Sequence, residues 1–106
     1  MMKKTNQENI RVPTPNNSKN EVFAVVDRIL GGSRMDVKCS DGKSRIARIP
    51  GSKRRRMGRI RIGDLLIVVP WDIQDEKADI LYRYRNSQIL LLKRKNILPS
   101  EFSTVS

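Results

Sequence analysis

Apolar residues along this chain gather in short runs that polar turn residues separate, as in small β-proteins. The run at residues 21–30 is rich in valine and isoleucine and stops at Gly31 and Gly32, which predicts a strand followed by a turn. Residues 34–40 alternate strictly between apolar and polar positions, as a half-buried strand does. We therefore expect two consecutive strands, the second with a charged outer face.

A tight hairpin is predicted next, because Asp41 and Gly42 join the second strand to a third at residues 43–49. An Asp-Gly pair between two strands is the strongest short-range hairpin signal, since such turns need positive φ angles. Ile46 and Ile49 are three residues apart, which breaks the alternation and predicts a β-bulge. Such a bulge bends a strand where a small sheet closes into a barrel.

Two further strands follow a basic segment. Residues 64–71 are apolar at both alternate sets of positions, which predicts a strand covered on both faces. Residues 78–84 return to alternation and predict a fifth strand, with Ile80, Tyr82 and Tyr84 on one face. The fourth strand should be the most buried of the five.

A short helix is predicted after the fifth strand. Asn86 or Ser87 is expected to cap the free backbone amides at its start, and residues 88–95 are good helix formers. The whole segment 86–98 should pack on the barrel. Five short strands and one helix predict an all-β protein with a five-stranded OB-fold barrel.

The two ends of the chain differ from this domain. Residues 1–20 are polar, contain prolines and hold almost nothing that could be buried, which predicts a disordered basic N-terminal arm. The predicted organisation is this arm, an OB-fold domain at residues 21–85, the helical segment at residues 86–98 and a flexible tail at residues 99–106.

Charge points to the kind of partner. The 106 residues include 22 lysines and arginines against 11 aspartates and glutamates, a formal net charge of +11. This imbalance favours a polyanionic partner, and nucleic acid is the first candidate. Arginine suits such a partner, because it binds phosphate oxygens bidentately and stacks on bases. The alternative interpretation of the basic segment is an ordinary run of solvated charges. The candidate RNA-binding residues, in a segment without any acidic residue, are Arg45, Arg48, Lys53, Arg54, Arg55, Arg56, Arg59 and Arg61.

Aromatic residues offer a second way to bind RNA. Tyr82 and Tyr84 on the predicted fifth strand are candidates for stacking on bases, although aromatic residues on strands more often fill the core. Phe23 is expected to lie in the core, and Trp71, which ends an apolar strand beside a proline, is expected to pack.

Catalytic and metal chemistry finds few candidates. The chain has no histidine and one cysteine, Cys39, which excludes zinc sites, Cys-His nucleophiles and histidine general bases. The acidic residues Asp72, Asp75, Glu76 and Asp79 match no known calcium-loop spacing, so we interpret them as a polar connection. We therefore expect a binding protein without a cofactor or metal, and not an enzyme.

The sequence also bears on location. No apolar run approaches the length needed to cross a bilayer, and the N-terminus lacks the apolar segment of a secretion signal. The single cysteine agrees with a reducing compartment. We expect a cytoplasmic monomer with no membrane partner.

Three segments carry a resemblance to a known family. Residues 31–51 read GGSRMDVKCSDGKSRIARIPG, residues 63–84 read GDLLIVVPWDIQDEKADILYRY, and residues 91–98 read LLKRKNIL. Together with RVPTP in the arm, they resemble the archaeal and eukaryotic translation initiation factor 1A family in order and spacing, the archaeal form more closely. The resemblance covers residues 21–98 and implies an S1-like OB domain.

The resemblance implies an initiation factor without catalytic activity. Such a factor binds the small ribosomal subunit at the decoding A site through rRNA contacts, and it supports initiation complex assembly and initiator tRNA placement. Its implied partners are rRNA, other initiation factors including the initiation GTPase, and indirectly the initiator tRNA. The resemblance adds Arg34, Lys38 and Lys43 to the RNA-contacting residues. The chain departs from the family in two ways: relatives usually carry a tryptophan just after the basic loop, where the segment at residues 57–59 has none, and the loop here is one residue longer.

Two other functions stay open from the sequence. A general single-strand RNA-binding OB module or RNA chaperone would bind unstructured RNA with little preference. A structural ribosome-associated protein would remain bound throughout translation, whereas an initiation factor must leave when the subunits join. The breadth and duration of binding therefore separate the three.

Overall fold

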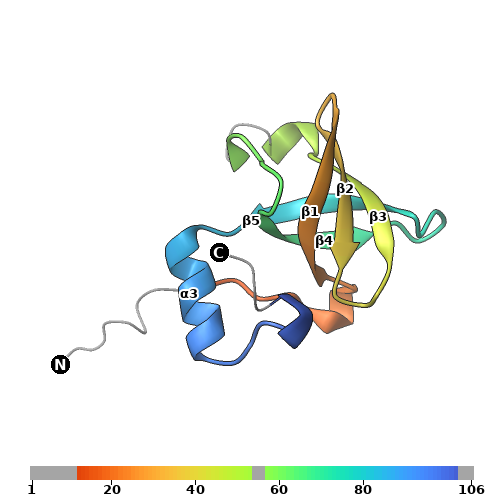
Figure 1. Cartoon of the computed structure of the whole chain (residues 1–106). Helices are drawn as coiled ribbons and strands as arrows, with labels where there is room; N and C mark the ends of the chain where they lie inside the picture. The colour runs from red at the N-terminus through yellow and green to blue at the C-terminus, as the bar shows by residue number, and fades with distance from the viewer. Residues whose placement is uncertain (1–11, 54–56, 103–106) are drawn as a thin grey trace.

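Five strands close into a barrel, and one helix packs beside it (Figure 1). The computed structural model describes residues 12–53 and 57–102. The strands are β1 (Val22–Gly31), β2 (Arg34–Cys39), β3 (Ser44–Arg48), β4 (Leu65–Pro70) and β5 (Lys77–Arg83). They follow the order β1-β2-β3-β5-β4, in which β3 and β5 run parallel and all other neighbours antiparallel. This is the predicted five-stranded OB-fold barrel.

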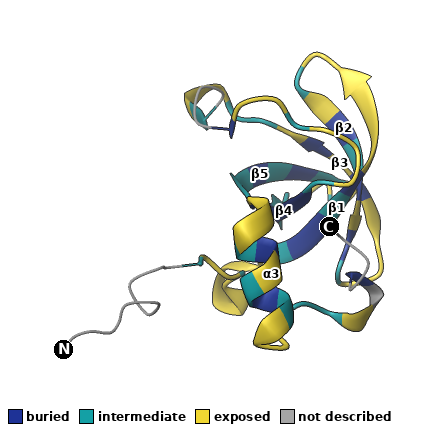
Figure 2. Ribbon diagram, turned by 60° about the vertical axis from the view of Figure 1, so that its left-hand side comes forward, coloured by how far each residue is buried: buried dark blue, intermediate teal, exposed yellow. Residues whose placement is uncertain are grey.

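Two apolar clusters hold the fold together, and β4 contributes to both. Leu66 and Val68 point into the barrel interior, while Leu65 and Ile67 face the second cluster between the barrel and the helix. All four side chains are at most 3% exposed, which confirms the prediction of a strand covered on both faces. Figure 2 shows the buried positions along the strands and on one side of the helix.

The hairpin between β2 and β3 lies where the Asp-Gly pair predicts it. The Cys39 N–H donates to the Lys43 carbonyl at 2.8 Å, and Gly42 has a φ of +89°. A side chain rarely tolerates that backbone conformation, which explains the glycine. The loop is two residues longer than predicted, because Ser40 and Lys43 also lie outside the two strands.

The predicted bulge in β3 is wrong. The pairing of β3 with β2 is regular, and Arg45 and Ala47 point inward while Ile46 points outward. Ile49 lies beyond the end of the strand, so its spacing from Ile46 carries no information about the ladder. The register shifts lie instead in β1, after Val26 and after Ile29, and they bend the long strand that pairs with both β2 and β4.

A further register shift separates residues that alternation places together. Ile67 pairs with Tyr82 and Val68 pairs with Ile80, so Leu81 is the extra residue of β5. Ile80 therefore belongs to the barrel interior, whereas Tyr82 and Tyr84 belong to the second cluster. The predicted common face of these three residues is wrong, because the bulge reverses the alternation.

The helix α3 (Asn86–Arg94) closes one side of the barrel, with Ile89 and Leu92 buried against the second cluster. Its N-cap is Arg85, whose backbone N–H donates to the Gln88 side chain at 2.8 Å. The predicted caps, Asn86 and Ser87, are instead the first helical residues. No helix in the described part of the chain is long and apolar enough to cross a membrane.

Both ends of the described chain pack more closely than predicted. Val12 joins the second cluster, the Tyr84 hydroxyl donates to the Pro13 carbonyl, and a short 3-10 helix, η1 (Asn17–Lys19), leads into β1. Residues 12–20 of the predicted arm thus make contacts with the domain, while its first eleven residues lie outside the described residues. At the other end Phe102, within the predicted tail, is buried in the same cluster. The mobility of both segments stays a prediction.

Candidate nucleic-acid interface

The outer face of the β2–β3 hairpin is basic. Arg34 and Lys38 are exposed because they alternate with the buried core residues of β2. Arg34 lies directly opposite Arg48 of β3 in the strand register. Asp36, the one acidic residue between Arg34 and Lys38 on β2, pairs with Arg28 at 2.7 Å. This face therefore presents cations to solvent.

Arg48 is fixed on this face by two neighbours. Its Nε donates to Asp79 Oδ1 at 3.0 Å, and its guanidinium lies 5.1 Å from the centre of the Trp71 ring. The Trp71 indole N–H donates to the same Asp79 oxygen at 3.0 Å, and Lys77 lies 5.6 Å from the ring. Guanidinium groups over an aromatic ring are attracted by its electron-rich face. Trp71 packs, as expected, but it packs against cations.

Arg45 is not part of the surface. Its side chain is 2% exposed and donates to Asp41 Oδ2 at 2.8 Å, to Asp75 Oδ1 at 3.1 Å and to the Asp75 carbonyl at 2.7 Å. Strand alternation turns Arg45 inward, so its side chain is buried and not exposed as an RNA contact would be expected to be, and its contact with RNA stays a prediction. Arg45 instead ties the β2–β3 loop to the β4–β5 loop.

Lys43 takes part in the same ion-pair group. Its Nζ lies 2.7 Å from Asp75 Oδ2, and the side chain remains exposed. The hydrogen bond from Lys43, followed by that from Arg45, lowers the pKa of Asp75, and the hydrogen bond from Arg45 lowers the pKa of Asp41. Both carboxylates therefore stay ionised near neutral pH and neutralise much of the cationic charge around them.

The loop between β3 and β4 continues the basic surface. Arg59 and Arg61 are exposed, and Lys53, at the end of the 3-10 helix η2 (Gly51–Lys53), is half-buried. No carboxylate in the described part of the chain pairs with any of these three. The predicted contacts Arg54, Arg55 and Arg56 lie outside the described residues.

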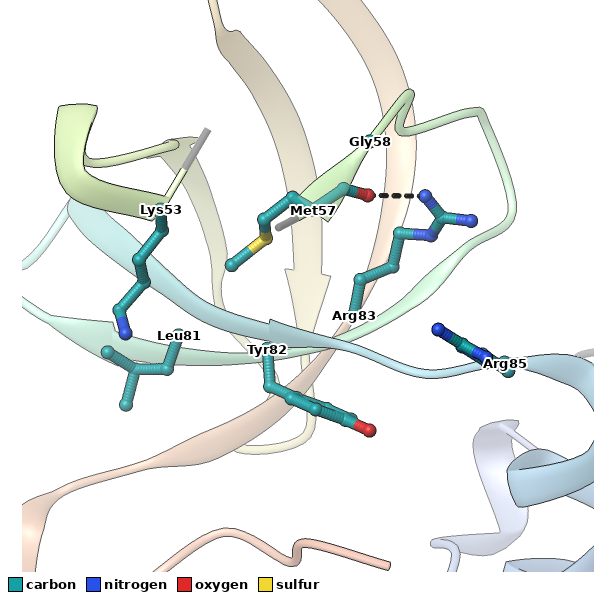
Figure 3. Close-up of a pocket in the computed structure, with 7 residues that line it drawn as sticks. All are labelled: Lys53, Met57, Gly58, Leu81, Tyr82, Arg83 and Arg85. Carbon is teal, nitrogen blue, oxygen red and sulfur yellow. Dashed lines mark hydrogen bonds between the residues drawn. The ribbon is translucent and has the colours of Figure 1, made fainter. Parts of the chain in front are cut away.

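Arg83 of β5 anchors this loop to the barrel. It donates to the Met57 carbonyl (Figure 3). It also donates to the Arg59 carbonyl at 3.1 Å, and its Nε lies 3.6 Å from Asp64. Met57 is 7% exposed and inserts into the barrel interior. Met57 therefore anchors the end of this loop in the barrel core.

A hollow of about 600 Å³ opens between this loop and β5 (Figure 3). Its lining combines cationic and apolar side chains without any carboxylate, from Lys53, Met57, Gly58, Leu81, Tyr82, Arg83 and Arg85. Arg83 and Arg85 were not among the residues predicted from the sequence, because they lie outside the basic run before β4 and outside the β2–β3 hairpin. The available signal was that Arg83 lies within the LYRY segment at residues 81–84 and Arg85 directly follows it.

The aromatic residues are largely withdrawn from solvent. Tyr84 is 3% exposed, so its ring belongs to the core and is not available to stack on a base. Burial also raises the pKa of its hydroxyl. Tyr82 is half-buried, and its hydroxyl accepts a hydrogen bond from Gln88 at 2.7 Å. Phe23 is buried as predicted.

Cys39 and the acidic residues offer no reactive centre among the described residues. Cys39 is 4% exposed, as a strand residue of the core should be, and burial raises the pKa of its thiol. The carboxylates of Asp75 and Asp79 pair with cations, while Asp72 and Glu76 are exposed. In the part of the chain that the structure describes, no group of three acidic, cysteine or histidine side chains is arranged to hold a metal ion.

Comparison with known proteins gives a consistent family. The family model described as "Translation initiation factor 1A / IF-1" matches residues 7–106. The protein named Translation initiation factor 1A from Picrophilus torridus is 50% identical over 99 residues, which cover 92% of this chain and 91% of that protein. The protein of the same name from Pyrococcus abyssi is 51% identical over 98 residues, covering 92% and 84%. The solution structure of a translation initiation factor from the Wolbachia endosymbiont of Brugia malayi aligns with a TM-score of 0.48 at 29% identity, covering 63% of this chain and 79% of that chain.

Proposed function

This chain belongs to the translation initiation factor 1A family, and we propose that it binds the small ribosomal subunit at the decoding A site through rRNA contacts. In that position it promotes initiation complex assembly and initiator tRNA placement. Its relatives are named as initiation factors, a class that works by binding. We further propose that the protein acts in the cytoplasm as a monomer and catalyses no reaction. Its partners would include other initiation factors, among them the initiation GTPase.

The observation that carries the RNA-binding part of this proposal is the distribution of ion pairs. Asp36, Asp41, Asp75 and Asp79 all pair with basic side chains. Cations with no carboxylate partner among the described residues also occur in and around α3, but five of them lie on the β2–β3 face and on the loop before β4, where they are available to phosphates. They are Arg34, Lys38, Lys53, Arg59 and Arg61.

The placement of the aromatic rings favours an initiation factor over a general single-strand binder. Proteins that bind unstructured strands usually present rings on which successive bases stack. The five aromatic residues of this chain are all described, and none of them is exposed. The Trp71 ring is flanked by Arg48 and Lys77. Recognition should therefore depend on phosphates and on the shape of a folded RNA.

Sedimentation with ribosomal particles tests the proposal. The purified protein should co-sediment with isolated small subunits, much less with large subunits, and should be lost when subunits join. The logarithm of its affinity should fall with the logarithm of the salt concentration, by about 0.7 to 0.9 per phosphate neutralised. Equal binding to unstructured RNA, or a salt slope near zero, would contradict the proposal.

A matched pair of variants separates a specific surface from net charge. Replacing Arg34 and Lys38 by alanine removes two cations from the proposed interface. Replacing Arg94 and Lys95 by alanine removes two exposed cations at the end of α3. Both variants have the same net charge, so a larger loss of subunit binding in the first variant supports the interface. Equal losses would mean that net charge alone drives binding.

A further inference from the structure

Asp79 is an acidic residue at the centre of a basic face. One of its two carboxylate oxygens, Oδ1, accepts two hydrogen bonds of 3.0 Å, one from Arg48 Nε and one from the Trp71 indole N–H. On electrostatic grounds alone, a carboxylate in this position repels a polyanion. Its position therefore needs another explanation than charge complementarity with RNA.

The strand register shows what Asp79 does. β2, β3 and β5 are neighbours in the barrel, with Arg34 opposite Arg48 and Arg48 opposite Asp79. The three side chains thus form one row across three strands. Side chains directly opposite each other on one sheet face have Cβ atoms roughly 5 Å apart, so like charges there repel each other. A phosphate between Arg34 and Arg48 would relieve that repulsion.

The bond to Asp79 leaves the terminal nitrogens of Arg48 free. Only Nε of Arg48 is used, and no acceptor in the described part of the chain takes a hydrogen bond from its terminal nitrogens. The side chain is 54% exposed, while the Trp71 ring restricts it on one side. A guanidinium that is already held in place loses less conformational freedom when it binds a phosphate.

We propose that Asp79 and Trp71 are positioning residues for RNA binding, which hold Arg48 so that its terminal nitrogens and Arg34 bind one phosphate together. The proposal rests on the proposed function, because it names the phosphate site within the RNA interface. It goes beyond that function in assigning a positioning role to a carboxylate and to the single tryptophan of the chain.

Two substitutions of Asp79 separate position from charge. Asp79→Asn and Asp79→Ala both remove one negative charge and raise the formal net charge from +11 to +12. Asparagine keeps an oxygen where Oδ1 lies, so Arg48 stays in place and affinity for small subunits should equal or exceed that of the wild type. Alanine removes the acceptor, so affinity should fall by about fivefold despite the added positive charge.

Asp72→Ala is the matched control. Asp72 is exposed, lies on the neighbouring β4–β5 loop and pairs with no cation among the described residues. Its removal gives the same net charge as Asp79→Ala and should leave affinity unchanged or slightly higher. If Asp79→Ala instead binds as well as Asp72→Ala, the carboxylate has no positioning role.

The salt dependence identifies the contact that is lost. Asp79→Ala should lower the slope of log affinity against log salt by about one, the effect of one lost phosphate contact. In an Arg48→Ala background, Asp79→Ala should cause no further loss, because the side chain that it positions is absent. An additive loss in the double variant would overturn the proposal.

Thermal melting shows whether Asp79→Ala folds. If it does not, a second pair of variants tests the proposal. Arg48→Lys keeps the charge, but lysine has a single side-chain nitrogen and lacks the fork that binds Asp79 through Nε and a phosphate through the terminal nitrogens, so affinity should fall several-fold. Arg34→Lys is its control and should cost less, since no carboxylate positions Arg34 among the described residues. Equal effects would overturn the proposal, whereas a wild-type protein that fails to bind small subunits would instead refute the proposed function.

Discussion

Replacing Arg45 by methionine tests whether this arginine is structural. The side chain is 2% exposed and joins Asp41 to Asp75. Removing one partner of a fully buried ion pair costs about 3 to 5 kcal/mol. Here the carboxylate side chains are 35% and 49% exposed and can be rehydrated, so we expect the lower value of about 2 to 3 kcal/mol.

The expected loss is large enough to measure by melting. For a domain of this size, 1 kcal/mol shifts the melting temperature by about 4 to 8 °C, so the Arg45→Met variant should melt roughly 10 to 20 °C lower than the wild type. Arg34→Met is the matched control: the residue lies exposed on the neighbouring strand, and its substitution should change the melting temperature little. Where the Arg45→Met variant is folded, it should keep most of its affinity for small subunits.

The pH dependence of stability provides an independent check. Hydrogen bonds lower the folded-state pKa of Asp41 and of Asp75 below the ordinary value of 3.8. Groups with a lowered folded-state pKa stabilise the fold fully above their unfolded pKa, and this stability is lost as the pH falls through the folded pKa. The wild type should therefore lose stability below about pH 4, and the Arg45→Met variant should lose less over the same range.

One result would refute this reasoning. If the Arg45→Met variant melts within a few degrees of the wild type but no longer binds small subunits, Arg45 is an RNA ligand. The side chain would then have to leave Asp41 and Asp75 when RNA binds, and strand alternation would not have decided its role.

Three further predictions concern the basic loop, the N-terminus and its anchor. Replacing Arg54, Arg55 and Arg56 together by alanine should weaken subunit binding in sedimentation assays without changing the melting temperature, and a parallel loss of stability would show that the loop is structural. Deleting residues 1–11 should leave the melting temperature unchanged and reduce subunit affinity modestly, since the described fold begins at Val12; unchanged affinity would leave the segment without a role in binding. Tyr84→Phe should cost about 1 kcal/mol in chemical denaturation by removing the hydrogen bond to Pro13, and no change would mean that this bond contributes nothing to stability.

Sequence patterns predicted the strands well because each strand's pattern is local. The valine-rich run of β1, the alternation of β2 and the fully apolar β4 depend only on neighbouring residues. Bulges could not be placed in the same way, because a bulge is defined by the partner strand. The extra residue Leu81 is visible only when β5 is aligned with β4.

The candidate site shows the same limit for charged residues. Composition identified Arg45 and Arg48 alike, although one is buried and the other exposed. Their different roles depend on Asp75 and Asp79, which lie 30 and 31 residues further along the chain. Alternation within β3 did contain the signal, but the apolar Ile46 on the outer face suggested the opposite orientation.

The parallel pair of β3 and β5 has a consequence for how the barrel forms. Only three residue pairs join these strands, from Ile46 opposite Lys77 to Arg48 opposite Asp79. Contacts between residues so far apart in sequence require a long loop to close, so such pairings form late in folding. Interactions that form after the rate-limiting step act mainly by slowing unfolding. The ion pairs of Arg45 and Arg48 cross this seam, and we therefore expect their removal to speed unfolding more than it slows folding.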